Sequence, residues 1–499
     1  MDTALKTEKV GHLERVWKGS TVRELTEDYV IPDSMPDAAS IADAEGVVTV
    51  QGKDTETGCV LLKATLAVSV VYAPEEGTGL RCLELSMPAE LRADAPGADM
   101  DSRTIAHIRI RSLEARLVNS RKVSVRAELE SEIACYRSGE LSLTVGMEGE
   151  EAVQLRREEA EVMPVSDVRE KTFAVTDEYA FPSGCGPQAR ILSRRAEIVT
   201  EDVQFVGGKV VFRGRVRSEL LLGGSDDGKT FVGRYETEFS QIMEMDAPSG
   251  DALPELSLFF TGVYFDLPEY GDGNERIQAE MHMAAQCVCR EKRVLTYVSD
   301  IYSNRTELVP QLQAVEYTAD VRAVSMRQTV ADRIEGTPCE GELLRATATV
   351  GAVTAEGGAV RATVNVRLLW VVPDGGVMSV RGRLHAEFTL SELSDGDTLR
   401  DVSVTVADVY CVPGTGDVRV SLRLDALAEK KCELSCVGAV TEDLDAWNAR
   451  GKMPSAVLTR VPSGADLWQL ARRYRSTVED ILTVNEGRTE GLLLIPKGR

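Results

Sequence analysis

The stretch GGSDDGKT, residues 223–230, has the glycine, lysine and threonine spacing of a phosphate-binding loop. Such a loop opens a helix, whose N-terminal N–H groups and dipole hold the phosphate. Here the following residues, FVGRYETEF, alternate between apolar or small side chains and charged ones, which is typical of a strand. Asp226 and Asp227 would also place negative charge beside a phosphate. We therefore interpret the stretch as the tip of a hairpin and expect no nucleotide cofactor, with a nucleotide hydrolase as the alternative.

The cysteines, histidines and carboxylates of the sequence form no recognisable catalytic or metal-binding pattern. Cys287 and Cys289 share one side of an alternating segment, and Cys432 and Cys436 have no second pair nearby. The four histidines lack metal-ligand spacing. Carboxylates are abundant, and paired-carboxylate catalysis stays open because such a pair meets only in the fold. The sequence predicts a protein that is not an enzyme, with no catalytic residues, metal site or cofactor.

Charge and hydropathy narrow the classes of partner. The 499 residues carry a net charge of −23, which disfavours nucleic acid and anionic lipid. We expect no membrane insertion, because no run approaches the roughly 18 apolar residues of a spanning helix. The charged N-terminal residues have no apolar signal segment, which predicts a cytoplasmic protein with free thiols.

A repeat of about 150 residues organises the chain. Segments 58–72, 208–222 and 358–372 each begin with glycine and continue with apolar residues at every second position. This period of two predicts half-buried strands. Turn-rich stretches separate further alternating runs, which indicates antiparallel hairpins.

The repeat predicts a mainly β fold with three related antiparallel domains of sandwich or barrel type. We place an N-terminal lead-in at 1–19, β domains at 20–155, 165–304 and 305–440, and a linker at 441–455. Residues 456–499 are expected to form a small βααβ unit. Asp466 is predicted to cap its first helix, and Ser476 or Thr477 its second. Core candidates in this tail are the following: Trp468, Leu470, Ile481 and Leu482.

The run VPSGADLWQLARRYRSTVEDILTVN, ending in LLIP, resembles a LysM domain over residues 456–498. Members of that family bind N-acetylglucosamine-containing glycans between two loops. The resemblance implies a groove for a partner or glycan formed by Gly464, Ala465, Asp466 and Leu467 on one side and by Asn485, Glu486 and Gly487 on the other. The family pattern G-D-T-L-W reads G-A-D-L-W here, which removes polar groups that would fix a sugar. Trp468 and Tyr474 are expected to pack in the core.

The stretches EDYVIPDSMPDAASI, EARLVNSRKVSVRAELE and VLTYVSDIYS resemble SPOCS domains of spore-coat-associated proteins. SPOCS-type copies followed by one LysM domain are typical of a family of spore-coat morphogenetic proteins. The resemblance implies a scaffold in the mother-cell cytoplasm at the forespore surface. Its LysM tail would bind a coat morphogenetic ATPase, and its β domains other coat proteins. The tail carries a net charge of +2 on an otherwise acidic chain, which suits an acidic protein partner. The alternative is a peptidoglycan-binding protein of the cell envelope.

Overall fold

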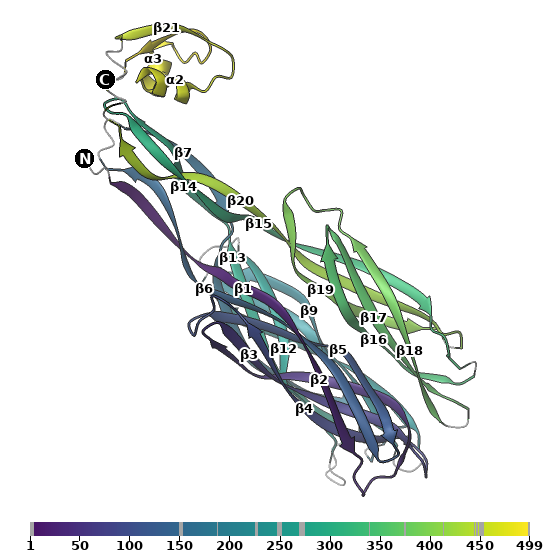
Figure 1. The fold of residues 1–499 in the computed structure, drawn as a ribbon. Coiled ribbons are helices and arrows are strands. Elements are labelled where there is room, and N and C mark those ends of the chain that lie inside the picture. The colour runs from purple at the N-terminus through teal and green to yellow at the C-terminus, as the bar shows by residue number, and fades with distance from the viewer. Residues whose placement is uncertain are drawn as a thin grey trace.

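The computed structural model describes residues 4–148, 153–186, 188–224, 228–246, 252–268, 275–338, 340–373, 376–412, 414–443, 445, 448 and 454–497. Residues 225–227 of the GGSDDGKT stretch, which include Asp226 and Asp227, lie outside these ranges. Strands make up 76% of the chain and helices 4%, so the mainly β prediction is confirmed. The molecule is elongated, with a broad body, a narrower stalk and a small tail unit at the end (Figure 1).

Within the described residues, repeats one and three contain six strands each, and repeat two contains eight. Repeat one contains β1 (Leu5–Val30), β2 (Ala38–Glu56), β3 (Cys59–Pro74), β4 (Arg81–Asp94), β5 (Arg103–Asn119) and β6 (Lys122–Met147). Repeat two contains β7 (Val153–Val162), β8 (Val165–Ala180), β9 (Arg190–Val206), β10 (Lys209–Gly223), β11 (Thr230–Glu244), β12 (Ala252–Asp266), β13 (Arg276–Glu291) and β14 (Arg293–Ser303). Repeat three contains β15 (Leu308–Arg333), β16 (Glu342–Glu356), β17 (Ala359–Val371), β18 (Val377–Thr389), β19 (Asp397–Cys411) and β20 (Asp417–Glu442).

The three predicted alternating segments are the middle strands β3, β10 and β17 of three small antiparallel sheets, β2-β3-β4, β9-β10-β11 and β16-β17-β18. Their apolar positions point inward, as the alternation predicts. In β3, for example, Val60, Leu62 and Leu66 have no exposed surface. The same core contains Val123 and Val125 of β6, so the small sheet and the long strands of repeat one bury their apolar faces against each other.

The first and last strands of a repeat pair antiparallel over their whole length. β1 pairs with β6 from Leu5 opposite Met147 to Val30 opposite Lys122, and β15 pairs with β20 in the same way. In repeat two this ribbon is divided into the pairs β7–β14 and β8–β13. β1 therefore begins inside the segment expected as a lead-in, and β7 occupies much of the gap expected at 156–164. Buried and exposed residues do not alternate regularly along β1, so the sequence pattern does not indicate a strand there. The main chain of β6 nevertheless supplies hydrogen bonds to β1.

The stalk consists of six strand segments, two from each repeat: 5–15, 136–147, 153–162, 293–303, 308–318 and 430–442. They share one core, in which Leu143, Leu295 and Val315 come from three different repeats. Four of these strands belong to elements of 26 residues, roughly 85 Å long if fully extended. Figure 1 shows the stalk between the body and the tail unit.

The body is also shared between repeats. Ala42, Leu192, Leu221 and Leu369 meet in one buried cluster, although they lie on β2, β9, β10 and β17. Repeats one and two also share a polar contact, since the buried carboxylate of Asp167 on β8 accepts a hydrogen bond from Arg103 on β5. The three repeats thus form one intertwined body rather than three separate globules.

A buried ion cluster lies where the three repeats meet. Arg345 on β16 has 1% of its side chain exposed and contacts Asp43 on β2, whose side chain is fully buried. Asp43 also accepts a 2.7 Å hydrogen bond from Arg367 on β17, and Ser193 on β9 lies 3.2 Å from Arg345. Burial and the charge of Arg367 lower the pKa of Arg345 to about 9, and its guanidinium pairs with the Asp43 carboxylate.

Candidate functional site

The tail unit has the predicted element order: β21 (Ala456–Val461), α2 (Leu467–Tyr474), α3 (Val478–Val484) and β22 (Gly491–Pro496). Asp466 caps α2 by accepting the Trp468 N–H at 2.9 Å, and Thr477 caps α3 by accepting the Asp480 N–H. Of the two predicted caps for α3, Thr477 is the one observed. β21 and β22 pair antiparallel along six residues.

The tail has a small core of its own. Ala471 and Ile481 are completely buried, together with Leu493 and Ile495 of β22. The predicted core residues Trp468 and Leu470 pack around this cluster and are only partly buried, as is Tyr474. Leu482 is likewise half-buried. The core predicted from the sequence therefore omits Leu493 and Ile495 of β22. The stretch LLLIP is too short for alternation to show which of its side chains point inward.

The first predicted loop is held in place by its own contacts. Gly464 adopts a positive φ of 77°, and Leu467 is half-buried against the tail core. One Asp466 oxygen accepts the capping N–H of Trp468, and the other accepts a 3.0 Å hydrogen bond from Arg156 on β7. Each oxygen of the Asp466 carboxylate therefore accepts a hydrogen bond from within the chain. Ala465 is partly buried in the tail core and adds no polar group.

The second predicted loop is built around the Asn485 side chain. Its amide nitrogen donates to the carbonyls of Ile481 and Leu494, both at 2.7 Å, and its oxygen accepts the Leu494 N–H at 2.8 Å. Both amide hydrogens are thus used to fasten the end of α3 to β22. Glu486 and Gly487 follow with positive φ angles of 54° and 80° and are exposed. The contacts of the two loops run to different partners, Arg156 for one and Leu494 for the other.

Helix α2 packs against the end of the stalk, a contact that sequence reasoning missed. Trp468 donates its indole N–H to Asp300 at 2.7 Å, and Arg472 lies 3.2 Å from the same carboxylate. The Tyr302 hydroxyl donates to the Ser476 carbonyl at 3.0 Å, and its ring meets Trp468 edge-on at 4.8 Å. Burial raises the pKa of the Tyr302 phenol. The sequence does hold a signal for this contact. Asp300 and Tyr302 are two residues apart and lie on one face of the strand, and a partly buried indole such as that of Trp468 needs a hydrogen-bond acceptor.

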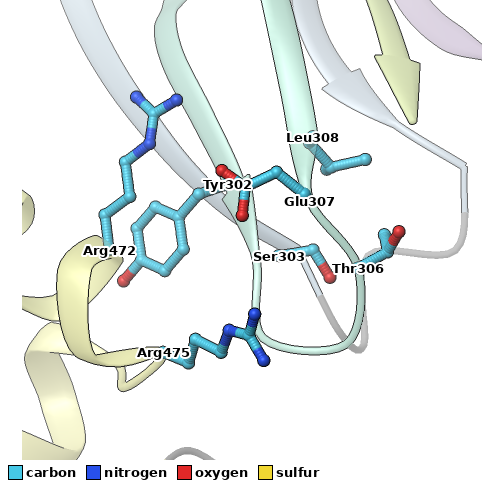
Figure 2. Close-up of a pocket in the computed structure, with 7 residues that line it drawn as sticks. All are labelled: Tyr302, Ser303, Thr306, Glu307, Leu308, Arg472 and Arg475. Carbon is cyan, nitrogen blue, oxygen red and sulfur yellow. The ribbon is translucent and has the colours of Figure 1, made fainter. Parts of the chain in front are cut away.

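A small pocket lies at this contact. It is lined by Tyr302, Ser303, Thr306, Glu307, Leu308, Arg472 and Arg475. Figure 2 shows the Tyr302 ring between the two arginines, with Arg475 directed toward Ser303. Its volume of about 10 Å³ is enough for roughly one water molecule, so no sugar fits there.

The outer side of the β21–β22 ribbon exposes three leucines. Leu458 and Leu492 are 61% and 62% exposed, and Leu494 is 38% exposed. Leu458 lies directly opposite Leu494, and Leu492 is two residues away on β22, so all three share one face. We call these three residues the leucine face. Arg460 lies opposite Leu492 on the same side and is exposed.

The GGSDDGKT stretch joins two strands, as predicted. Gly223 at the end of β10 pairs with Thr230 at the start of β11, and the strand continues to Glu244. Gly228 has a positive φ of 67° and packs against Gly79 in the corresponding turn of repeat one. The helix that a phosphate loop requires is replaced by a strand.

The cysteines that share one side are buried. Cys287 and Cys289 have no exposed surface on β13. Burial raises the pKa of Cys289 to about 11 and raises that of Cys287 further, so neither is a ready thiolate at neutral pH. Among the residues that the structure describes, no group of three His, Cys, Asp or Glu side chains is arranged to hold a metal ion.

Comparisons with known proteins provide no family for this chain. No family model matches the sequence, and no curated protein does. Among solved structures, the crystal structure of Pseudomonas aeruginosa OccK5 (OpdH) aligns with 80% of this chain and 98% of its own at 10% identity. The TM-score of that alignment is 0.10, which carries no argument about fold. Within the described parts of the chain, no helix is long and apolar enough to cross a membrane.

Proposed function

We propose that this protein is a non-enzymatic scaffold of spore-coat assembly whose tail unit binds a coat morphogenetic ATPase. In this proposal the tail is a LysM-type domain, the first two repeats are SPOCS-type units and the third is a divergent β domain. All three repeats are related and of sandwich or barrel type. The single observation that carries the proposal is the exposed leucine face at the far end of the molecule. Protein partners bury such apolar residues at the centre of an interface.

The contacts of the two predicted loops favour a protein partner over a glycan. Sugar recognition needs polar groups that are free to bond with hydroxyls, because an unpaired buried polar group is costly. Asn485 already uses both amide hydrogens, and each Asp466 oxygen already accepts one hydrogen bond from within the chain. In contrast, the leucine face offers its apolar side chains without a partner in the described chain. Its neighbour Arg460 adds positive charge, which suits an acidic surface.

The stalk supports the scaffold role. Its core joins all three repeats, and α2 packs on its end through Trp468, Asp300 and Tyr302. The tail is therefore held in a fixed place at one end, with the body at the other (Figure 1). This geometry separates the proposed ATPase contact from the surfaces of the body that would meet other coat proteins.

A pull-down with the full chain tests the proposal. The ATPase is the bait, and the preys are the parent chain, Leu492→Glu and the control Val206→Glu. Val206 is 58% exposed at the end of β9, which matches Leu492 in exposure but lies in the body. We expect Leu492→Glu to lose capture and Val206→Glu to keep it. Equal capture of both variants would show that the leucine face is not the contact.

Sedimentation with purified peptidoglycan examines the alternative of a glycan-binding envelope protein. We expect the full chain to remain in solution. The contrary result is that the full chain pellets with peptidoglycan and that pelleting is lost when Asn485 or Asp466 is replaced by alanine in a variant whose folding is verified by circular dichroism. That result would favour a glycan-binding protein and contradict the proposal.

A further inference from the structure

The body has an open cavity of about 660 Å³ that lies between all three repeats. β2 and β5 of repeat one contribute to its wall, as do β9 and β12 of repeat two and β16 to β19 of repeat three. The volume falls within the range of roughly 300–1,000 Å³ that is usual for small-molecule sites. Because every repeat supplies part of the wall, the cavity exists only in the assembled body.

The cavity is basic, although the whole protein is strongly acidic. Six arginines line it, against three glutamates. The arginines are Arg109, Arg111, Arg195, Arg367, Arg381 and Arg383, and the glutamates are Glu45, Glu114 and Glu197. The net charge of the whole chain is −23, so the charge of the cavity is opposite in sign to that of the protein as a whole. Such a concentration of positive charge attracts an anion.

Three of these arginines are fixed by main-chain carbonyls of another repeat. Arg109 of repeat one donates to the carbonyls of Val350 and Gly351 at 2.8 and 2.9 Å. Arg195 of repeat two donates to a carbonyl of β16 at 2.9 Å, and Arg367 of repeat three donates to a carbonyl of β5 at 3.1 Å. Guanidinium groups anchored in this way are held ready for a ligand at little further cost in entropy.

Not all of the donor capacity is used. The Nε groups of Arg111 and Arg367 are buried without a hydrogen-bond acceptor among the described residues. The side chain of Arg381 forms no hydrogen bond or salt bridge with any described residue, although its main chain pairs with Arg367 in the sheet. Glu130 lies 3.9 Å from Arg111, too far for a hydrogen bond. Burial and the charge of Arg367 lower the pKa of Arg381 despite an opposing effect of Glu114.

Part of the remaining wall is apolar. Leu258, Phe259 and Phe260 of β12 line it, as do Ile108 and Ile110 of β5. Phe259 and Phe260 are each 8% exposed. A basic region next to apolar residues is complementary to an amphiphilic anion. The charged head group of such a ligand would bind the arginines, and its apolar body would lie on the apolar residues.

We propose that the cavity binds a small organic anion with a carboxylate or phosphate head group and an apolar body. The head group accepts hydrogen bonds from Arg111, Arg367 and Arg381, and the apolar body lies on the Leu258–Phe260 wall. Since the site is assembled from three repeats, its ligand also strengthens their association. This inference is independent of the proposed role of the tail.

Isothermal titration calorimetry of the full chain tests the site with decanoate, decyl phosphate, decanol and inorganic phosphate. We expect decanoate or decyl phosphate to bind at one molecule per chain and to raise the melting temperature. Decanol and inorganic phosphate each lack one half of the recognised chemistry and should bind at least about tenfold more weakly. The difference between the two amphiphiles identifies the preferred head group.

Two substitutions assign the binding to the cavity. Arg381→Gln should weaken binding of the preferred amphiphile by about tenfold or more, because a charge-assisted hydrogen bond is lost. The matched control is Arg213→Gln, which removes the same charge from the exposed side of β10. Failure of both amphiphiles to bind would overturn the proposal, as would equal affinity for decanol or an equal loss in both variants.

Discussion

Replacing Asp43 with asparagine should destabilise the whole body, because this carboxylate is shared by two arginines at the junction of the repeats. The Asp43 side chain is fully buried, and that of Arg345 is 1% exposed. Asparagine keeps the shape but removes the charge, which leaves Arg345 and Arg367 facing each other. The nearest remaining carboxylate oxygens are Oε1 of Glu45, which lies 3.4 Å from Arg345 and 3.5 Å from Arg367, and Oε1 of Glu219, which lies 3.6 Å from Arg345.

The magnitude follows from this environment. Removing one partner of a buried ion pair costs about 3–5 kcal/mol. The secondary contacts to Glu45 and Glu219 offset part of that cost, so we expect a loss of about 3 kcal/mol. The control is Asp54→Asn, because Asp54 pairs with Lys63 at 2.9 Å on the surface with both side chains about half exposed. Such a pair contributes about 0–1 kcal/mol.

Urea denaturation followed by circular dichroism measures both variants against the parent chain. The expected result is a clear fall of the midpoint for Asp43→Asn and an almost unchanged midpoint for Asp54→Asn. If Asp43→Asn differs from the parent by less than about 1 kcal/mol, the junction does not hold the repeats together, and the description of one intertwined body is wrong.

Three further predictions concern other contacts. Asp300→Ala removes the acceptor of the Trp468 indole, so hydrogen exchange in α2 should accelerate by about tenfold, measured by mass spectrometry, while exchange in the body stays unchanged. Asp167 is buried, which raises its pKa, but hydrogen bonds from one main-chain N–H and two arginines outweigh this and leave the pKa below its usual value. Its stabilising contribution is present above about pH 4 and is lost as the pH falls through the lowered pKa, so Asp167→Asn should flatten the acid limb of a stability–pH curve. Gly79→Ala should destabilise more than Gly77→Ala in a thermal melt, because both have positive φ but only the Gly79 Cβ would meet a neighbouring turn, at 2.9 Å.

Much of the local structure could be predicted from alternation and turn residues alone. The strands after Gly58, Gly208 and Gly358 are present, and the GGSDDGKT stretch joins two strands. The Asp466 cap is also present, because capping depends on a few neighbouring residues. These features are decided within about 15 residues of chain, where periodicity carries the information.

The arrangement of the repeats could not be predicted in this way. Asp43 and Arg345 are 302 positions apart, and neither stands out from the many charged residues of the chain. The sequence predicts a lead-in for the stalk half of β1, since the exposed side chains of this strand show little alternation. The groove residues Gly464, Ala465, Asp466, Leu467, Asn485, Glu486 and Gly487 came from a resemblance, and a resemblance does not reveal which side chains are already bonded internally.

The most direct test of the central claim is the affinity of the full chain for the coat morphogenetic ATPase, measured by biolayer interferometry. The parent chain is compared with the double variant Leu458→Glu/Leu492→Glu and with Val206→Glu. Burial of each leucine should contribute about 1–2 kcal/mol, so we predict a Kd about a hundredfold higher for the double variant and no change for Val206→Glu. An unchanged Kd for a correctly folded double variant would contradict the proposal that the leucine face binds this partner.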